Sequence, residues 1–101
     1  MIEHVNDEAR FNELIKEGTV LVDFFATWCG PCKMLSPIIE QVAAEHPELK
    51  VVKVDVDEVP SVAGKYGIQA IPTLFLVKDG KTVASQMGFA NKNQLENFIN
   101  K

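Results

Sequence analysis

The stretch "VLVDFFATWCGPCK", residues 20–33, decides the fold of this 101-residue chain. It opens with a nearly continuous apolar run, Val20–Phe25, which is the pattern of a β-strand covered on both faces. A short loop follows, and then come both cysteines of the chain, separated by Gly30 and Pro31. Proline suits the first position of a helix, because its missing N–H needs no partner there. The stretch therefore predicts a buried strand, a loop and a helix that carries Cys32.

Helices and strands are predicted to alternate on both sides of this stretch. Hydrophobic spacing indicates the elements, and turn-forming residues mark their ends. The predicted elements are a helix capped by Asn6 or Asp7 and ended by Gly18, the strand over 20–25, a helix that Pro37 kinks and that runs to Glu45, a strand over 50–57, at most a short helix within 59–67, strands over 73–77 and 82–87 joined by a tight turn at 78–81, and a last helix capped by Asn91. Helices between strands favour right-handed parallel crossovers. The sequence therefore predicts an α/β fold with a central mixed β-sheet and helices on both faces.

Length and charge narrow the class of protein. With 101 residues, of which 47% are hydrophobic, the chain can build one packed core, and we expect residues 1–101 to form a single domain. Ten basic and fourteen acidic residues, without a run of like charge, argue against nucleic acid or a membrane surface as the partner. The first residues lack the pattern of a secretory signal, and no apolar run reaches the roughly 20 residues of a membrane helix. We expect a cytoplasmic monomer, although an exported protein whose signal had been removed would look the same.

Cys29 and Cys32 allow three interpretations. A structural disulfide across so short a loop stabilises the fold by only about 2 kcal/mol, against about 3 kcal/mol for a loop of about 15 residues. A closed zinc site needs about four ligands, and the only other soft ligands, His4 and His46, lie far apart in the sequence. A redox pair needs one sulfur exposed at the start of a helix and a second sulfur within its reach. The pattern favours the redox pair, and we expect no metal.

The positions of the two thiols predict different roles for them. Cys29 ends the loop, so its sulfur is expected beside the unpaired amides and the positive dipole end of the helix. These favour the thiolate and make Cys29 the nucleophile, whereas Cys32, on the helix, is the resolving thiol. Lys33 adds positive charge near the thiolate, although a solvated lysine in the first helical turn explains it as well.

The segment "FFATWCGPCK" and the later "AIPTL", in this order of elements, resemble the thioredoxin family. The resemblance covers nearly the whole chain. It implies the thioredoxin fold and thiol–disulfide exchange on protein substrates, through a redox-active Cys29–Cys32 disulfide and without a bound cofactor. It also implies a thioredoxin reductase, a flavin enzyme that uses NADPH, as the partner that restores the dithiol.

Asp23 interrupts the buried strand six residues before Cys29. Burial of an unpaired carboxylate raises its pKa, which suits a proton shuttle, but a strand that exposed this face would make Asp23 an ordinary surface residue. The resemblance favours the shuttle, which takes the proton from Cys32 through water. It also implies an auxiliary role for Lys53 beside this carboxylate, although a solvent-facing lysine of an alternating strand is the simpler interpretation.

The resemblance assigns other residues to a groove for protein substrates. Trp28 forms one wall, although a lone tryptophan is more often part of a core, and Gly88 and Phe89 form the other wall, where glycine allows close backbone approach. Ile71–Pro72 is expected to be a cis peptide that leaves the Ile71 backbone free to pair with an extended substrate. A proline that opens a strand also needs no special explanation.

Two residues depart from the commonest thioredoxin pattern, which has a second tryptophan at Phe25 and often glycine at Ala70. The first change affects fluorescence rather than chemistry, and the second narrows the groove. Gly30 and Pro31, also assigned to substrate binding, place no charge between the cysteines, whereas a histidine there stabilises the thiolate of related oxidants. The sequence therefore predicts a protein-disulfide reductase. An exported oxidase or isomerase, and a binding module whose redox turnover is incidental, are the alternatives.

Overall fold

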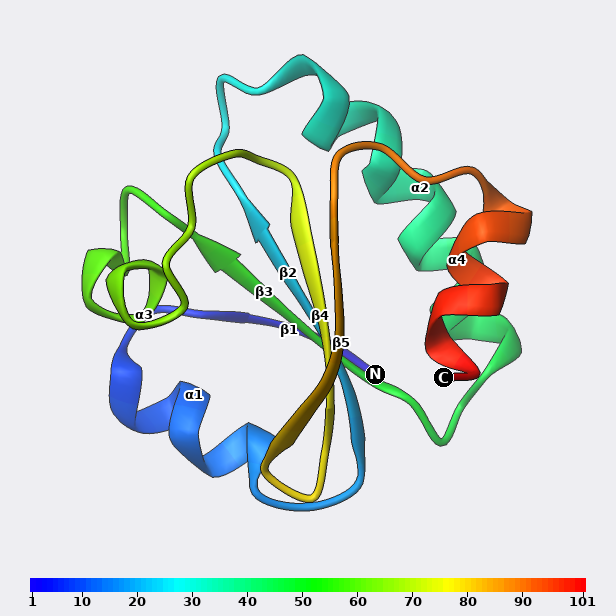
Figure 1. Cartoon of the computed structure of the whole chain (residues 1–101), viewed down its shortest axis with the longest axis horizontal. Coiled ribbons are helices and arrows are strands. Elements are labelled where there is room, and N and C mark those ends of the chain that lie inside the picture. Colours follow the sequence, from blue (N-terminus) through cyan, green and yellow to red (C-terminus); the bar gives the residue numbers. More distant parts are fainter.

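The computed structural model describes all residues of the chain, 1–101. Its elements follow in the order β1 (Ile2–Val5), α1 (Glu8–Ile15), β2 (Thr19–Phe25), α2 (Gly30–Glu45), β3 (Lys50–Asp55), α3 (Pro60–Lys65), β4 (Thr73–Lys78), β5 (Lys81–Met87) and α4 (Lys92–Ile99) (Figure 1). All predicted elements are present, together with one further strand, β1.

The five strands form one mixed sheet in the order β1-β3-β2-β4-β5. β1, β3 and β2 run parallel, whereas β4 is antiparallel to β2 and β5 is antiparallel to β4. The predicted mixed sheet is confirmed, and β1 extends its parallel edge. Hydrophobic patterning misses β1 because the strand has four residues, of which only Val5 is buried. Its pairing partner, β3, lies far along the chain, so no local signal marks the pairing.

Helices cover both faces of the sheet, as predicted. α2 and α4 lie on one face, and α1 and α3 lie on the other (Figure 1). The central strand β2 supplies both layers: Leu21 packs in the core under α2 and α4, whereas Val20 and Val22 pack in the core under α1 and α3. Because side chains alternate along a strand, Asp23 points to the same face as Leu21. The acidic residue of β2 is therefore directed towards the helix that carries the cysteines.

The ends of α2 differ slightly from the expectation. Cys29 is the N-cap and Gly30 begins the helix, so Pro31 holds the second helical position rather than the first. The change costs nothing, because the first four N–H groups of a helix have no partner within it. Pro37 lies inside α2, which continues to Glu45. None of the helices in the fold combines the length and the apolar character needed to cross a membrane.

Side-chain caps mark the starts of α1 and α4. Asp7, rather than Asn6, caps α1, and its carboxylate accepts the N–H of Arg10. At α4, the Asn91 side chain accepts the N–H of Gln94, and the Gln94 side chain accepts the N–H of Asn91. This reciprocal pair is a complete capping box, which confirms the predicted start of the last helix.

Candidate active site

The two cysteines lie at the N-terminus of α2, where they form a disulfide. Their Cα atoms are 5.3 Å apart. Cys29 caps the helix, and its Sγ accepts a hydrogen bond from the backbone N–H of Cys32, with nitrogen and sulfur 3.2 Å apart. An amide at this distance and the positive end of the helix dipole both favour negative charge on the Cys29 sulfur once the disulfide is reduced.

The expected exposure of the first sulfur is wrong for the disulfide form. Cys29 is 5% exposed and Cys32 is 4% exposed, so exposure does not distinguish the two thiols. Both are packed with Ala26, and side chains from distant parts of the chain, including Val56 and Ile71, lie against them. The helix cap, which places an amide on the Cys29 sulfur, is what makes the pair asymmetric.

Asp23 is buried, which rules out the interpretation of an exposed strand face. Asp23 is 2% exposed, and its Oδ1 has no hydrogen-bond partner. Burial raises the pKa of this carboxyl to about 6, against a smaller opposing effect of the Lys53 ammonium. A carboxyl with a pKa this close to neutral pH can accept a proton from a thiol and release it again.

Lys53 lies beside Asp23 and does not face solvent. The two residues are directly opposite each other in the β2–β3 pair, and the Lys53 Nζ is 3.8 Å from the Asp23 Oδ2. Lys53 is 8% exposed. Its Nζ donates a hydrogen bond of 2.7 Å to the Ser36 Oγ and lies 5.1 Å from the centre of the Phe25 ring. The simpler interpretation from the strand pattern is therefore wrong.

A cavity of about 310 Å³ lies between Lys53 and the resolving thiol of Cys32. Cys32, Ser36 and Lys53 all line it, and so does Lys33 at its solvent side. The cavity has room for several water molecules. It connects Cys32 with Lys53, whose ammonium lies 3.8 Å from the Asp23 carboxylate, although Asp23 itself does not line the cavity.

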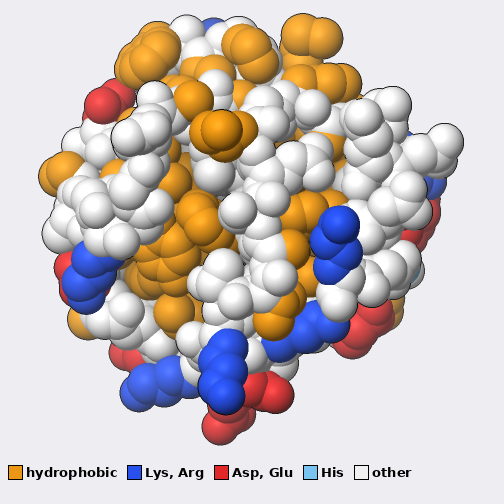
Figure 2. Space-filling view, viewed as in Figure 1, with side chains coloured by type: hydrophobic (Ala, Val, Ile, Leu, Met, Phe, Trp, Pro, Cys, Tyr) orange, Lys and Arg blue, Asp and Glu red, His pale blue; other side chains and the backbone are white.

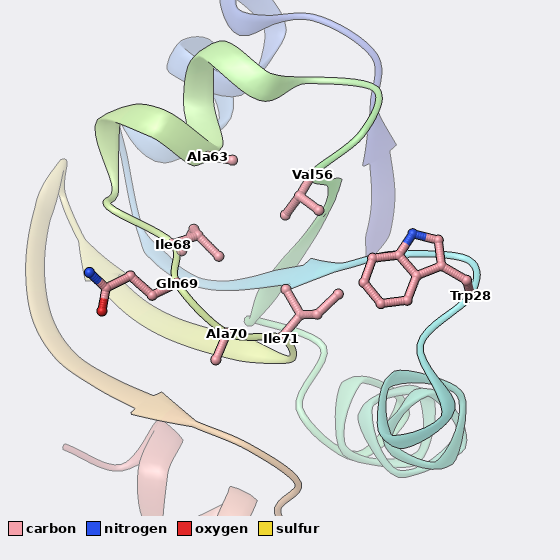
Figure 3. A pocket seen from close by; sticks show the side chains of 7 residues that line it. All are labelled: Trp28, Val56, Ala63, Ile68, Gln69, Ala70 and Ile71. Atoms are coloured by element: carbon pink, nitrogen blue, oxygen red, sulfur yellow. The ribbon is translucent and has the colours of Figure 1, made fainter.

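Trp28 stands beside the disulfide at the surface and is not part of the core. It is 70% exposed, and its indole Nε1 donates a hydrogen bond of 2.9 Å to the Asp57 carboxylate. With the α3 region and the loop before β4 it lines a mainly apolar cavity of about 200 Å³. Figure 3 shows the indole at one end of this cavity, with Val56 and Ile71 pointing into the space beside it.

The loop before β4 holds the predicted cis peptide, Ile71–Pro72. Neither the N–H nor the C=O of Ile71 forms a hydrogen bond within the protein. Gly88 donates its N–H to the Pro72 carbonyl, 2.8 Å away. Pro72 itself precedes the first residue of β4. The Ile71 backbone is thus free for an extended partner, as the resemblance implies.

The opposite wall of the expected groove is only partly as predicted. Gly88 has a φ of +90°, and a Cβ at this position would meet nothing within 4 Å. Its glycine is explained by the left-handed backbone and not by close approach. Phe89 is 42% exposed, but neither residue lines the cavity beside Trp28. Gly88 is held instead by its hydrogen bond to the Pro72 carbonyl.

Two residues of the site have no counterpart in the sequence prediction: Asp57 and Ser36. Ser36 follows Cys32 by four residues, and this spacing places both on one helix face. That signal is present in the sequence but does not point to Lys53, because the contact depends on how α2 packs on β3. Asp57, just beyond β3, is a polar residue at the end of a parallel strand, where sites often form.

A dithiol pair at a helix N-terminus, next to a buried carboxylate on a mixed sheet, defines a thiol–disulfide oxidoreductase. The thioredoxin family model matches residues 2–101, and the chain belongs to the thioredoxin family. It is 46% identical over 102 residues to the thioredoxin of Listeria monocytogenes, covering 100% of this chain and 98% of the relative. It is 49% identical over 92 residues to that of Bacillus subtilis, covering 90% and 88%.

Solved structures give the same result for the fold. A Plasmodium falciparum thioredoxin matches with a TM-score of 0.91 and 38% identity, over 97% of this chain and 96% of that chain. The oxidised mitochondrial thioredoxin 3 of Saccharomyces cerevisiae matches with a TM-score of 0.90 and 39% identity, over 98% and 93%. The predicted family and thioredoxin fold are confirmed. The activity is that of a protein-disulfide reductase, whose redox centre is the Cys29–Cys32 pair of the protein itself.

Proposed function

We propose that Cys29 attacks the substrate and that Cys32 completes the reaction, within one thioredoxin domain that spans residues 1–101. The Cys29 thiolate forms a bond to one sulfur of a substrate disulfide, and the other substrate sulfur leaves as a thiolate and takes up a proton. Cys32 then loses its proton and displaces the first substrate sulfur. Two electrons pass to the substrate, and the Cys29–Cys32 bond forms. The amide hydrogen bond to the Cys29 sulfur is the observation that carries this assignment.

Asp23 is proposed as the group that takes the proton from Cys32, with Lys53 as an auxiliary. The raised pKa of about 6 and the unpartnered Oδ1 make the carboxylate an effective base close to neutral pH. The cavity that Cys32 shares with Lys53 supplies the path, through water. Transfer to the buried carboxylate removes its uncompensated charge, which favours the resolving step.

An extended segment of a protein substrate is proposed to bind beside the disulfide. The free Ile71 backbone offers one donor and one acceptor for an added strand. One side of this segment is proposed to contact Trp28, Gly30 and Pro31. Pro72 lies next to the paired Ile71 backbone. Figure 2 shows that apolar side chains gather at the end of the molecule where α2 begins, while charged side chains gather towards the opposite end.

The second side of the proposed substrate site is formed by Gly88 and Phe89, the latter exposed for contact. Met34 and Met87, which are 64% and 69% exposed, enlarge the apolar surface around it. Methionine side chains adapt to differently shaped partners. Such a surface suits a reductase that acts on many proteins.

The partners are proposed to be disulfide-containing proteins and an NADPH-dependent flavin enzyme, thioredoxin reductase. One solved relative, 38% identical with a TM-score of 0.90, belongs to a structural study of thiol resolution in a yeast mitochondrial 1-Cys peroxiredoxin by glutathione and thioredoxin systems. A reductase needs its pair returned to the dithiol, which supports a reducing compartment such as the cytoplasm. The protein is proposed to act as a monomer, without nucleic acid or a membrane.

The exposed apolar surface also favours a second candidate, a binding module in which redox turnover is incidental. One experiment separates the two. Reduction of insulin by dithiothreitol is followed with the wild type and with Cys32→Ser. The reductase accelerates the reaction, and Cys32→Ser accumulates a mixed disulfide through Cys29, identified by peptide mass mapping. A wild type that gives no acceleration while still binding reduced and oxidised insulin equally supports the binding module.

A further inference from the structure

Ser36 occupies a position of the site to which the proposed mechanism gives no role. It lies on α2 one turn after Cys32, on the same face of the helix, and it lines the cavity between Cys32 and Lys53. Its Oγ accepts a hydrogen bond of 2.7 Å from the Lys53 Nζ. Ser36 is thus the only hydrogen-bond acceptor that the Lys53 ammonium contacts within the protein.

The distance between Lys53 and Asp23 is longer than their chemistry favours. An ammonium and a carboxylate in a buried site normally close to about 2.8 Å, but the Lys53 Nζ is 3.8 Å from the Asp23 Oδ2. The Asp23 Oδ1 has no hydrogen-bond partner at all. The ammonium has three protons, and the neighbouring carboxylate has an unsatisfied oxygen, yet the one close hydrogen bond of the ammonium goes to Ser36.

We propose that Ser36 is a positioning residue that holds the Lys53 ammonium away from Asp23, and that it thereby keeps this carboxylate basic enough to accept the proton of Cys32. The inference rests on the proposed role of Asp23 in the resolving step. A direct ion pair would stabilise the ionised carboxylate and make it a weaker base. The direction of the Asp23 pKa, which burial raises despite Lys53, agrees with a separated pair.

The other titratable groups near Asp23 and Lys53 do not pair with the Asp23 carboxylate, so its charge environment depends on Lys53 and on the Ser36 contact that holds Lys53. From β1, His4 lies opposite Lys53 in register and lines the solvent side of the same cavity. From α2, Lys33 and Cys32 line it as well, and no acidic side chain does. On the β4 side, the residue opposite Asp23 is the apolar Leu74. Lys53 is therefore the only charged group paired with Asp23.

The test is a carboxyl titration of Asp23 by carbon NMR in the disulfide form, where neither cysteine titrates. Ser36→Ala removes the hydroxyl, and Lys53 then turns to Asp23, so the Asp23 pKa falls by about one pH unit. Ser36→Thr keeps the hydroxyl and is the matched control. In this variant Asp23 should titrate as it does in the wild type. Ser36 is half-buried on a helix that tolerates alanine well, and a thermal melt checks that each variant is folded.

A second pair of variants tests whether Ser36 acts through Lys53. Lys53→Met raises the Asp23 pKa, and the double variant Ser36→Ala/Lys53→Met titrates like Lys53→Met alone. In the reductase assay, Ser36→Ala moves the acidic limb of the pH profile of the resolving step to lower pH and lowers its plateau by about threefold, because a weaker base transfers the proton more slowly.

An Asp23 pKa that is unchanged or raised in Ser36→Ala overturns the proposal, and so does an effect of Ser36→Ala that persists without Lys53. The failure of the proposed function is seen separately. If the wild type does not accelerate insulin reduction, the role of Asp23 in catalysis is lost, whereas the carboxyl titration still decides whether Ser36 positions Lys53.

Discussion

The two ends of α2 differ in how far the polar groups beside them are hydrogen-bonded. At the N-terminus, the cap is the sulfur of Cys29, and the nearby Asp23 is buried with one oxygen unpartnered. At the C-terminus, the backbone N–H of His46 bonds to the carbonyls of Val42 and Ala43. The His46 ring lies with Nε2 2.8 Å from the Glu96 carboxylate.

The C-terminal end of α2 contributes to stability, whereas the N-terminal end carries the reactive groups. Paired groups at the C-terminal end tie α2 to α4 and have nothing left to react. At the N-terminal end, the unpartnered oxygen of Asp23 destabilises the fold locally and leaves the carboxylate free to take up a proton, while the amide bond to the Cys29 sulfur favours its thiolate. The comparison predicts that substitutions at the first end change activity or raise stability, whereas those at the second end change stability alone.

The largest expected effect is the loss of activity in Cys29→Ser. Without the sulfur at the helix cap no mixed disulfide forms, because Cys32 lacks the amide contact that Cys29 receives. Insulin reduction should fall to the rate of dithiothreitol alone. Trapping of substrate by Cys32 in this variant would show that the helix cap does not select the attacking thiol.

Asp23→Asn should stabilise the folded protein and at the same time slow the resolving step of the reaction. The folded-state pKa of Asp23 is raised from 3.8 to about 6, so ionisation disfavours the folded state above about pH 6, and this penalty disappears as the pH falls towards 4. At about 1.4 kcal/mol for each pKa unit, the penalty at pH 8 is about 3 kcal/mol.

Urea unfolding measures this penalty directly. The free energy of unfolding of Asp23→Asn should exceed that of the wild type by up to about 3 kcal/mol near pH 8 and by little near pH 4. The resolving step should slow by at least about tenfold near pH 7. Equal stability of the two proteins at both pH values contradicts the assignment of a buried, destabilised carboxylate.

Two glycines near the site offer a matched pair of smaller effects. Gly88→Ala places a side chain on a left-handed backbone with φ of +90°, which costs about 1 kcal/mol. Gly30→Ala meets nothing within 4 Å and has an ordinary backbone, so its free energy of unfolding should stay the same or rise by up to about 1 kcal/mol. Thermal unfolding of both variants checks the difference, and similar losses in the two would mean that φ is not the cause at Gly88.

The smallest effect is expected at the other end of α2, in His46→Gln. The hydrogen bond to Glu96 raises the pKa of His46 above 6.5, so its stabilising contribution is fully present below about pH 6 and is lost as the pH rises through the folded-state pKa. The melting temperature of His46→Gln should therefore fall below that of the wild type near pH 5 and approach it near pH 9. Reductase activity should not change, and Glu96→Gln should behave in the same way.

Elements with strong local patterns were predictable from the sequence. β2, α2 and the capped α4 follow from apolar runs, helical spacing and the Asn91–Gln94 pair. β1 was not predictable, because a short, mostly exposed edge strand has no hydrophobic pattern of its own and depends on pairing with β3. The fold is thus encoded locally, except where pairing across the sheet decides.

The site was predictable in its cysteines and less so in their surroundings. Spacing places Cys29 at the helix start, but its burial comes from Val56 and Ile71, which no local pattern brings there. The choice between a buried and an exposed Asp23, and between a paired and a solvated Lys53, depends on the register of β2 with β3. Such tertiary facts lie outside the reach of periodicity.

The most direct test of the central claim is the reactivity of the two thiols in the reduced protein. The rate of alkylation by iodoacetamide is measured against pH, and the modified residue is identified by mass mapping. Cys29 should react first, with an apparent pKa below the roughly 8.5 of a free thiol, because the helix amides stabilise its thiolate. Preferential reaction of Cys32, or a Cys29 pKa at or above that of a free thiol, would contradict the account.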